Sequence, residues 1–381
     1  MGTLAGMRRM FGAAVGSVLA LVFAAAPAPG HAASRLPTNF VGMNLDQGTL
    51  ALSPGSLARQ LRLMAGSGAG AVRFPIYWAD VQPIAGQAPD LAPIDRLVGG
   101  AARAGLRSLP TVLEAPAWAR QFPNRPFSPP AQPAQYAAFL SALVARYGPR
   151  GSFWARNPGL RRLPIHDWQV WNEESGSKFW TDDDQTPLAQ DRVAWTRPYL
   201  ALLTAARAAV RRADSHARIV LGGLFGESWT MLAHLYAADP AAVRRSFDVM
   251  AVHPYTAKVI NVEKAVRFNR AVLRRYGDGR KPIVMTEWGW PSSVGHLRTN
   301  LGFEATSAQQ AQRLADSLRM LSRDRRSLGL ESIWWYDWAE PDAGISVFDY
   351  SGLWRRRPDG RMVAKPALGA LRRTVRALRG R

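Results

Sequence analysis

Short apolar runs alternate along the chain with longer segments in which apolar residues recur at helical spacing. Eight of the short runs predict β-strands: Asn39–Leu45, Ala71–Ile76, Arg107–Leu113, Ile165–Val170, Arg218–Leu224, Asp248–His253, Pro282–Thr286 and Glu331–Tyr336. The segments that follow them predict eight helices: Pro54–Ala65, Pro93–Gly105, Pro133–Tyr147, Pro198–Ala213, Ser228–Ala238, Val262–Tyr276, Ser307–Arg323 and Lys365–Leu378. Several of these helices begin with proline, which the first turn tolerates.

This alternation predicts the α/β class, with one domain built as a single (β/α)8 TIM barrel. Strands separated by helices pair in parallel through crossover connections, and eight such units close a barrel. An open doubly wound sheet is the alternative, but Gly42-Met43-Asn44 does not match the glycine-rich phosphate turn common in that fold. The Pro-rich segments 119–133 and 148–164 are expected to be long loops at the barrel rim.

Residues 1–33 have the features of a signal peptide. Two early arginines supply positive charge, residues 10–26 are mostly apolar and small, and small residues near position 33 suit cleavage. A membrane anchor is the alternative, although the apolar stretch is short, diluted by Gly and Ala, and followed by prolines. We therefore expect a secreted, extracytoplasmic protein whose residues 34–381 form the barrel, with no stable membrane span after cleavage.

Composition excludes some kinds of site and leaves the role of the charge open. The 381 residues include no cysteine, so the chain can form neither a disulfide nor a thiolate metal site. The net charge of +21 comes mostly from arginine, and one interpretation is affinity for an anionic polymer or an anionic envelope surface. The interpretation that we favour is a solvated, arginine-rich surface. No compact basic stripe with interleaved aromatic residues indicates a nucleic-acid partner.

Two segments place a carboxyl group at the C-terminal end of a predicted strand. Trp171-Asn172-Glu173 follows the fourth strand, and Thr286-Glu287-Trp288 ends the seventh. The C-terminal end of a barrel strand holds a side chain rigidly while leaving it open to solvent. Hydrolysis of a sugar acetal needs one carboxyl group to protonate the leaving oxygen and a second to stabilise or attack the oxocarbenium-like carbon. The pair therefore indicates a glycosidase.

Further motifs follow in an order that resembles the clan A retaining glycoside hydrolases, most closely families 39 and 5. The resemblance covers residues 39–370, nearly all of the expected mature chain. The motifs are Val72-Arg73-Phe74 with Trp78, Val81-Gln82-Pro83, Ala115-Pro116-Ala117-Trp118, Trp171-Asn172-Glu173, His253-Pro254-Tyr255, Thr286-Glu287-Trp288-Gly289 and Trp335-Tyr336. Each motif is weak alone, whereas their order and spacing together are specific.

The resemblance implies roles for the residues around the two glutamates. Glu173 would be the general acid/base and Glu287 the nucleophile of a retaining mechanism, which needs the two carboxyl groups about 5–5.5 Å apart. Asn172 would donate its amide to the sugar 2-hydroxyl. Arg73 would keep the nucleophile ionised through a charge-assisted hydrogen bond, and Tyr255 would donate to the other oxygen of Glu287.

Other polar and aromatic residues have two interpretations each. His253 either lines the sugar site or is a core histidine whose hydrogen bonds are satisfied. A tryptophan of the last strand is expected to form the platform on which a pyranose face stacks. The family pattern favours Trp335, and Trp338 would serve from the following loop. Three more tryptophans are candidates either for outer sugar subsites or for packing: Trp78, Trp118 and Trp180.

The chain departs from the family pattern immediately after the expected acid. Glu174-Ser175 stands where relatives usually have proline. The added carboxyl group either acts on Glu173 by like-charge repulsion or points away into a loop. The departure leaves the two catalytic assignments in place and puts the local backbone and the substrate in question.

Three functional hypotheses follow from the sequence. The first is a secreted retaining hydrolase that cleaves a polysaccharide from within, favoured by the long rim loops and distributed tryptophans. The second is an exo-acting glycosidase of the same fold that releases single sugars such as xylose or arabinose. The third is a carbohydrate-binding barrel without catalysis, against which the opposed carboxyl pair argues. The partner in each is a polysaccharide or oligosaccharide. We expect no metal, because the histidines lack ligand spacing, and no cofactor, because the mechanism needs none.

Overall fold

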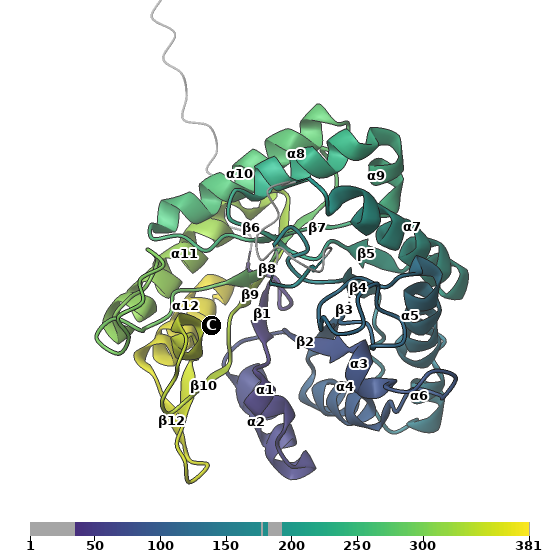
Figure 1. Cartoon of the computed structure of the whole chain (residues 1–381). Helices are drawn as coiled ribbons and strands as arrows, with labels where there is room; N and C mark the ends of the chain where they lie inside the picture. The colour runs from purple at the N-terminus through teal and green to yellow at the C-terminus, as the bar shows by residue number, and fades with distance from the viewer. Residues whose placement is uncertain (1–34, 177, 182–192, 381) are drawn as a thin grey trace, which may run out of the picture. The chain divides into compact units, whose positions relative to one another are not determined.

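Parallel strands lie at the centre of the computed structural model, which describes residues 35–176, 178–181 and 193–380 (Figure 1). Within these residues, a nine-stranded sheet has the order β5-β4-β3-β2-β1-β9-β8-β7-β6, and its paired strands are parallel. The strands are β1 Val41–Asn44, β2 Ala71–Tyr77, β3 Arg107–Leu113, β4 Asp167–Val170, β5 Arg218–Val220, β6 Leu224–Phe225, β7 Met250–His253, β8 Ile283–Trp288 and β9 Leu330–Trp335. The expected signal peptide, residues 1–33, lies outside the described residues.

The two edges of this sheet belong to one barrel strand. The predicted fifth strand is split, so that β5 pairs with β4 while β6 pairs with β7. A parallel bridge joins Val220 to Val249, and the Leu221 N–H donates to the Val249 carbonyl at 3.1 Å. The sheet therefore closes with eight strand positions, which confirms the predicted α/β barrel.

Helices surround the strands, from α2 round to α12 (Figure 1). Eight occupy the predicted positions: α2 Pro54–Gly66, α4 Ala92–Ala104, α5 Pro133–Tyr147, α7 Thr196–Ala213, α8 Ser228–Ala238, α10 Val259–Arg275, α11 Ser307–Leu328 and α12 Pro366–Arg379. The shorter helices were not predicted: α1 Gln47–Leu50, α3 Trp78–Val81, α6 Ser152–Arg156, α9 Pro240–Ser246 and the 3-10 turn η1 Val347–Tyr350. Among the described residues, none of the helices has the length and apolarity to cross a bilayer.

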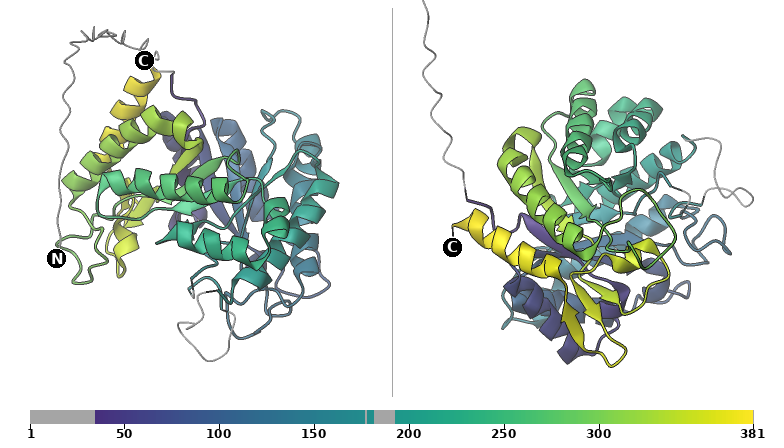
Figure 2. Two further views of the ribbon diagram at one scale, coloured as in Figure 1. Left: turned by 90° about the horizontal axis from the view of Figure 1, so that it is seen from above. Right: turned by 90° about the vertical axis from the view of Figure 1, so that its left-hand side faces the viewer.

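Local sequence explains where the long helices begin and end. Thr306 caps α11 through its side chain, and Gln309 bonds back to the Thr306 N–H, so that two otherwise unpaired donors are satisfied. The helix ends at Gly329, whose φ of 62° is the left-handed conformation that glycine adopts at little cost. Its apolar side, which includes Leu314, Leu318 and Leu321, is buried. Helix α12 packs beside it (Figure 2).

A small sheet follows β9 and was not predicted from the sequence. It has the order β10-β11-β12, with β10 Ala339–Pro341, β11 Trp354–Arg356 and β12 Met362–Ala364. Three-residue strands carry too little apolar alternation to be recognised. Lys365 fixes this sheet to the barrel by donating to Glu340, to Ser292 Oγ at 2.8 Å and to the Tyr350 carbonyl at 3.0 Å.

A buried polar layer lies near the C-terminal ends of the barrel strands. Asn44, Arg73, Gln169 and Thr286 are each at most 6% exposed, although the residue that precedes each of them along its strand is apolar. Buried polar groups are costly unless their hydrogen bonds are satisfied. The partners of this layer, described next, place it directly beneath the two glutamates that the sequence singles out.

Candidate active site

Glu287 projects from β8 and is held by two donors. Its Oε1 accepts from Arg73 Nη1 at 2.8 Å, and its Oε2 accepts from the Tyr255 hydroxyl at 2.9 Å. The residue is only 8% exposed. Both oxygens are therefore fixed in direction, which is what a carboxylate needs if it is to attack a carbon from one defined side.

The Arg73 guanidinium bonds to the polar layer on every side. Its Nε donates to Gln169 Oε1 at 2.7 Å, its Nη1 also donates to Asn44 Oδ1 at 2.6 Å, and its Nη2 donates to Asn172 Oδ1 at 2.7 Å. Gln169 in turn donates to the Leu221 carbonyl at 3.0 Å. Because its other acceptors are neutral, the positive charge of Arg73 acts mainly on Glu287.

Glu173 lies in a strained turn immediately after β4. Trp171 and Glu173 have φ values of 68° and 47°, the left-handed region that non-glycine residues rarely occupy. The Glu173 N–H donates to the Gly222 carbonyl at 3.1 Å, which ties this turn to the break between β5 and β6. Strain of this kind occurs at functional sites, where surrounding contacts hold the backbone in place.

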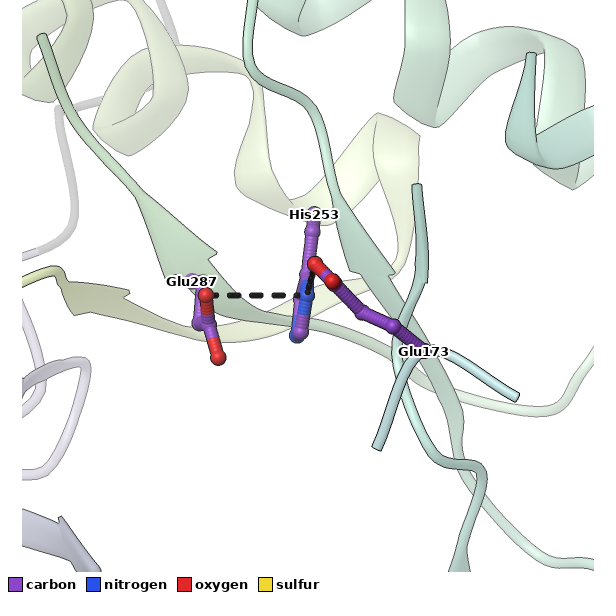
Figure 3. Close-up of side chains that lie close together, drawn as sticks. All are labelled: Glu173, His253 and Glu287. Carbon is purple, nitrogen blue, oxygen red and sulfur yellow. Dashed lines mark hydrogen bonds and ion pairs between the residues drawn. The ribbon is translucent and has the colours of Figure 1, made fainter. Parts of the chain in front are cut away.

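His253 connects the two glutamates (Figure 3). Its Nδ1 lies 2.7 Å from Glu173 Oε1 and 3.7 Å from Glu287 Oε2, and its Nε2 lies 2.9 Å from Thr286 Oγ1. The ring is fully buried. Of the two interpretations from the sequence, the structure supports a residue of the site, although the ring reaches the site through Glu173 rather than through an open face.

The two carboxyl groups face each other across a short gap. One carboxylate oxygen of Glu173 and one of Glu287 lie within 4.8 Å of each other, with the His253 ring between the side chains (Figure 3). Glu173 is the more open of the two, with 17% of its side chain exposed against 11% for Glu287. This arrangement presents one anchored carboxylate and one accessible carboxyl group to a common point.

Burial and nearby charges keep Glu287 ionised and Tyr255 protonated. Burial alone would raise the pKa of Glu287, but charge from His253 and Arg73, with the hydrogen bonds from Arg73 and Tyr255, holds that pKa below its usual value. Burial, reinforced by the negative charge of Glu287, raises the pKa of Tyr255 well above its usual value. Glu287 is therefore a carboxylate, and Tyr255 remains a hydrogen-bond donor.

The site also has the spacing of a possible cation site. One ligand atom from each of Glu173, His253 and Glu287 lies within 4.8 Å of the other two, a spacing that a divalent cation could use. However, the Arg73 guanidinium, 2.8 Å from Glu287, opposes a second positive charge at that position. The short contact between His253 and Glu173 also occupies two of the three candidate ligand atoms. The trio therefore fits a proton-transfer centre better than a cation site.

Trp335 and Trp338, which were expected to stack on sugar, are buried, so that expectation was wrong. Trp335 is 0% exposed and lies edge-on to Trp288, and Trp338 is 0% exposed and donates to Gln60 Oε1 at 2.9 Å. Trp78 is stacked on Phe139 with 1% exposure. Trp180 is also buried, and Trp118 is half-buried against Trp78. The four buried rings serve packing, because none of them presents an open face, whereas the half-buried Trp118 remains a candidate for either role.

Tyr336 is the last-strand aromatic that the site uses, and the sequence interpretation missed it. It is half-buried, stands edge-on to Tyr255 at 6.5 Å between ring centroids, and is close enough to Glu287 and Glu173 for their charges to act on it. Burial, followed by the charge of Asp337 and then of the two glutamates, raises the pKa of Tyr336 well above its usual value. The sequence analysis sought the platform among tryptophans only and followed the family pattern to Trp335, so this tyrosine was passed over.

Glu174, the residue after the expected acid, points into the protein. It is 0% exposed, and neither carboxyl oxygen makes a hydrogen bond of normal geometry within the described part of the chain. A Cβ built on Gly222 would lie 1.9 Å from Glu174 Oε2, so only glycine leaves room for the carboxyl group. Burial, with a smaller contribution from the charge of Glu173, raises the pKa of Glu174 to about 8.

No protein-family profile and no curated protein matches the chain, whereas solved structures share its fold. A family 39 glycoside hydrolase from Bacteroides cellulosilyticus WH2 is 19% identical and aligns over 91% of this chain and 65% of its own, with a TM-score of 0.62. Exo-beta-1,4-mannosidase Op5Man5 from Opitutaceae bacterium strain TAV5 is 17% identical over 88% of this chain and 59% of its own, with a TM-score of 0.58. GH5_18 from Streptomyces cattleya in complex with GlcNAc is 18% identical and aligns over 89% of this chain and 80% of its own, with a TM-score of 0.61.

Two of these structural neighbours are described as glycoside hydrolases of family 39 and of GH5, the families that the sequence motifs resemble. The chain thus has the (β/α)8 barrel of that class of enzyme. It spans less than two thirds of the first two neighbours, 65% and 59% of their lengths.

Proposed function

We propose that this protein is a secreted retaining glycoside hydrolase that cleaves the O-glycosidic bonds of a polysaccharide from within the chain. The observation that carries the proposal is the separation of the carboxyl groups, within 4.8 Å between one oxygen of Glu173 and one of Glu287. Retaining glycosidases hold their pair about 5–5.5 Å apart, whereas inverting enzymes need about 6.5–9.5 Å to admit a water molecule. A binding barrel has no need of such a pair.

In the first step, Glu287 attacks the anomeric carbon of the sugar. Its carboxylate oxygen forms a bond to that carbon while the bond to the leaving oxygen breaks, and the proton of Glu173 passes to the leaving oxygen. Arg73 and Tyr255 aim the attacking carboxylate. The negative charge on Glu287 is then consumed in the ester, so that Glu173 is left as the carboxylate of the site.

In the second step, Glu173 acts as a base. It takes a proton from water, the resulting oxygen bonds to the anomeric carbon, and the ester bond to Glu287 breaks. Two inversions give net retention. Asn172 has its side-chain oxygen bonded to Arg73, which orients its NH2 group as a donor for the sugar 2-hydroxyl. His253, bonded to Glu173, supports both proton transfers.

Exo action on single terminal sugars is the second candidate. One structural neighbour is described as an exo-beta-1,4-mannosidase, which favours this alternative by analogy of fold. Endo action is supported by the long segment that follows β3 and includes residues 119–133, because long rim loops suit an open cleft. The other expected rim loop, residues 148–164, was placed wrongly: it lies between α5 and β4, contains α6, and leads into a strand at the opposite end of the barrel from the site. The size of the products distinguishes the two.

Export and contact with a charged envelope are also part of the proposal. The charged, apolar and small-residue segments of residues 1–33 support secretion. The net charge of +21 supports attraction to anionic glycans or an anionic envelope surface, although a solvated surface alone would have the same composition.

The proposal is tested with a panel of polysaccharides and aryl glycosides, comparing the wild type with Glu287→Gln and Glu173→Gln. Each change is expected to lower turnover by about a hundredfold or more, because one removes the attacking carboxylate and the other the transferable proton. Glu227→Gln, at an exposed glutamate beyond β6, is the matched control and is expected to retain activity.

Added azide separates the two roles. It is expected to rescue both variants on activated aryl glycosides and to give glycosyl azides of opposite anomeric configuration. Products of mixed length from polysaccharide indicate endo action, and single sugars indicate exo action. Unchanged turnover in either variant would remove that glutamate from the mechanism, and binding without any cleavage would support the non-catalytic barrel.

A further inference from the structure

The proposed reaction determines the side of the site on which the leaving sugar lies. Glu173 gives its proton to the leaving oxygen, while Glu287 attacks from the opposite face of the ring. The leaving sugar must therefore extend past Glu173. The described segments on that side are the turn after β4, in which the Gly176 N–H donates to the Glu173 carbonyl at 2.9 Å, and the end of β6.

Phe225, the last residue of β6, stands beside the acid/base. It lies in register with His253 of β7, whose Nδ1 is 2.7 Å from Glu173 Oε1. Residues in register across a pair of parallel strands project from the same face of the sheet. His253 projects toward the two glutamates, so Phe225 faces the same mouth of the barrel from the neighbouring strand position.

The turn that carries Glu173 holds one edge of the Phe225 ring. A Cβ built on Gly176 would lie 2.6 Å from Phe225 Cε1 and 3.5 Å from the Glu173 carbonyl oxygen. Glycine at 176 therefore lets the ring come within contact distance of the backbone that positions the acid/base.

The rest of the Phe225 ring is open to solvent, because the residue is 38% exposed. The tryptophans first considered as platforms are buried, with Trp335 and Trp338 at 0%. Single exposed apolar residues are common on protein surfaces and need no explanation there. Phe225 differs because its fixed edge and its strand register place the open face next to the group that protonates the leaving oxygen.

We propose that Phe225 is the platform on which the leaving-group sugar stacks. The inference rests on the proposed function and adds a binding subsite to it. The ligand is a pyranose residue of a glycan, whose C–H face is apolar and whose hydroxyl edges are polar. A phenyl ring offers a face and no hydrogen bond, so this subsite accepts sugars with different hydroxyl patterns while discriminating against leaving groups without a sugar face.

Two substrates with the same reacting sugar separate stacking from chemistry. One is an oligosaccharide that the panel shows to be cleaved, and the other is the glycosyl fluoride of the part released from its non-reducing side, whose leaving atom is too small to reach Phe225. Phe225→Ala is expected to lower kcat/KM for the oligosaccharide about tenfold and for the fluoride less than about twofold. Phe225→Trp is expected to restore the oligosaccharide value.

Phe268→Ala is the matched control, because Phe268 is 47% exposed but lies on α10, packed against Trp229. It is expected to leave both substrates unaffected. Equal losses of Phe225→Ala on the two substrates, or no loss on either, would overturn the platform. Failure of the wild type to hydrolyse the glycosyl fluoride would overturn the proposed function, and the inference with it. This outcome is read from the wild type and needs no Phe225 variant, so the two failures can be told apart.

Discussion

Four oxygen acceptors surround the guanidinium of Arg73, from three barrel strands and the turn after one of them. A buried charge is tolerated only when such partners replace its water shell. Glu287 is the one charged partner among the four. Lysine could not reproduce this planar set of donors, so Arg73 sets the direction and the ionisation of the attacking carboxylate together.

Glu174 leads to a prediction about stability and pH. Burial raises its pKa from an ordinary value of 4.5 to about 8, so the folded protein keeps a proton that the unfolded chain loses between those values. The contribution of Glu174 to stability is therefore fully present below pH 4.5 and declines as pH rises toward 8, by about 1.4 kcal/mol per pH unit. Glu174→Gln, which cannot ionise, is expected to lack that decline.

The measurement for Glu174 is the thermal midpoint of both proteins between pH 5 and 9. The variant is expected to gain on the wild type as pH rises, and activity at neutral pH is expected to persist because the amide resembles the protonated acid. Glu227→Gln, at an exposed site, serves as the control and is expected to follow the wild type. Parallel curves for Glu174→Gln and the wild type would show that Glu174 does not hold a proton when folded.

At the scale of single residues, the sequence predicted the reactive groups better than the residues expected to contact the sugar. Glu173, Glu287, Arg73, Asn172 and Tyr255 carry motif positions, and the structure brings them together around one gap. Strand alternation separates two faces of a strand but does not say which one is open, because that depends on the loops and helices packed against it. The last-strand tryptophans were therefore expected at the site on residue type and family pattern alone, and the half-buried tyrosine beside them was not.

The split of the fifth barrel strand connects the fold to the site. Between β5 and β6 the chain passes through Gly222 and Gly223, and the latter has a φ of 91°. A Cβ at Gly223 would lie 2.2 Å from His253 Nε2. The Gly222 carbonyl accepts the Glu173 N–H. The break thus leaves space for His253 and fixes the acid/base turn.

Gly223→Ala is predicted to disrupt the site as well as the barrel. The added methyl group collides with the His253 ring, so we expect a loss of at least about tenfold in kcat/KM and a lower thermal midpoint. Gly226→Ala is the matched control, because Gly226 also has a positive φ, 58°, but a Cβ there would meet nothing within 4 Å. Equal effects of the two changes would mean that backbone strain, and not the ring contact, is responsible.

Element positions followed from the sequence because long periodic segments dominate this chain. The eight strand positions and eight long helices lie where periodicity predicts them. The split after Val220 was not predicted, although adjacent glycines inside a strand pattern are a signal of a bulge or bend. The sheet β10–β12 was missed because its strands are too short to show a period.

At the scale of the molecule, exposed arginines lie along the outer helices α11 and α12. Helices α11 and α12 lie side by side (Figure 2), and their exposed arginines are Arg319, Arg323, Arg326, Arg372, Arg373 and Arg376. Asp316 and Asp324 pair with Arg319 and Arg323, whereas α12 contains no acidic residue. An anionic polymer would therefore meet, on α12, positive charge that no acidic residue of the same helix offsets.

This distribution predicts salt-dependent retention on an anionic polysaccharide matrix. Changing the three exposed arginines of α12 to glutamine is expected to lower the salt concentration at elution, because each removes an exposed charge. The matched control replaces Lys264, Arg274 and Arg275 of α10, which are also exposed, and is expected to have the smaller effect. Equal retention on acidic and neutral matrices across a salt series would contradict any role of the charge in binding.

Covalent trapping tests the central claim most directly, because double displacement requires an ester between the sugar and Glu287. The protein is incubated with a 2-deoxy-2-fluoro glycosyl fluoride of the sugar that the panel identifies, and peptides are then analysed by mass spectrometry. We predict one added sugar on the peptide that contains Glu287, and none in Glu287→Gln. A sugar attached to any other residue, or a first product of inverted configuration from the normal substrate, would contradict the account.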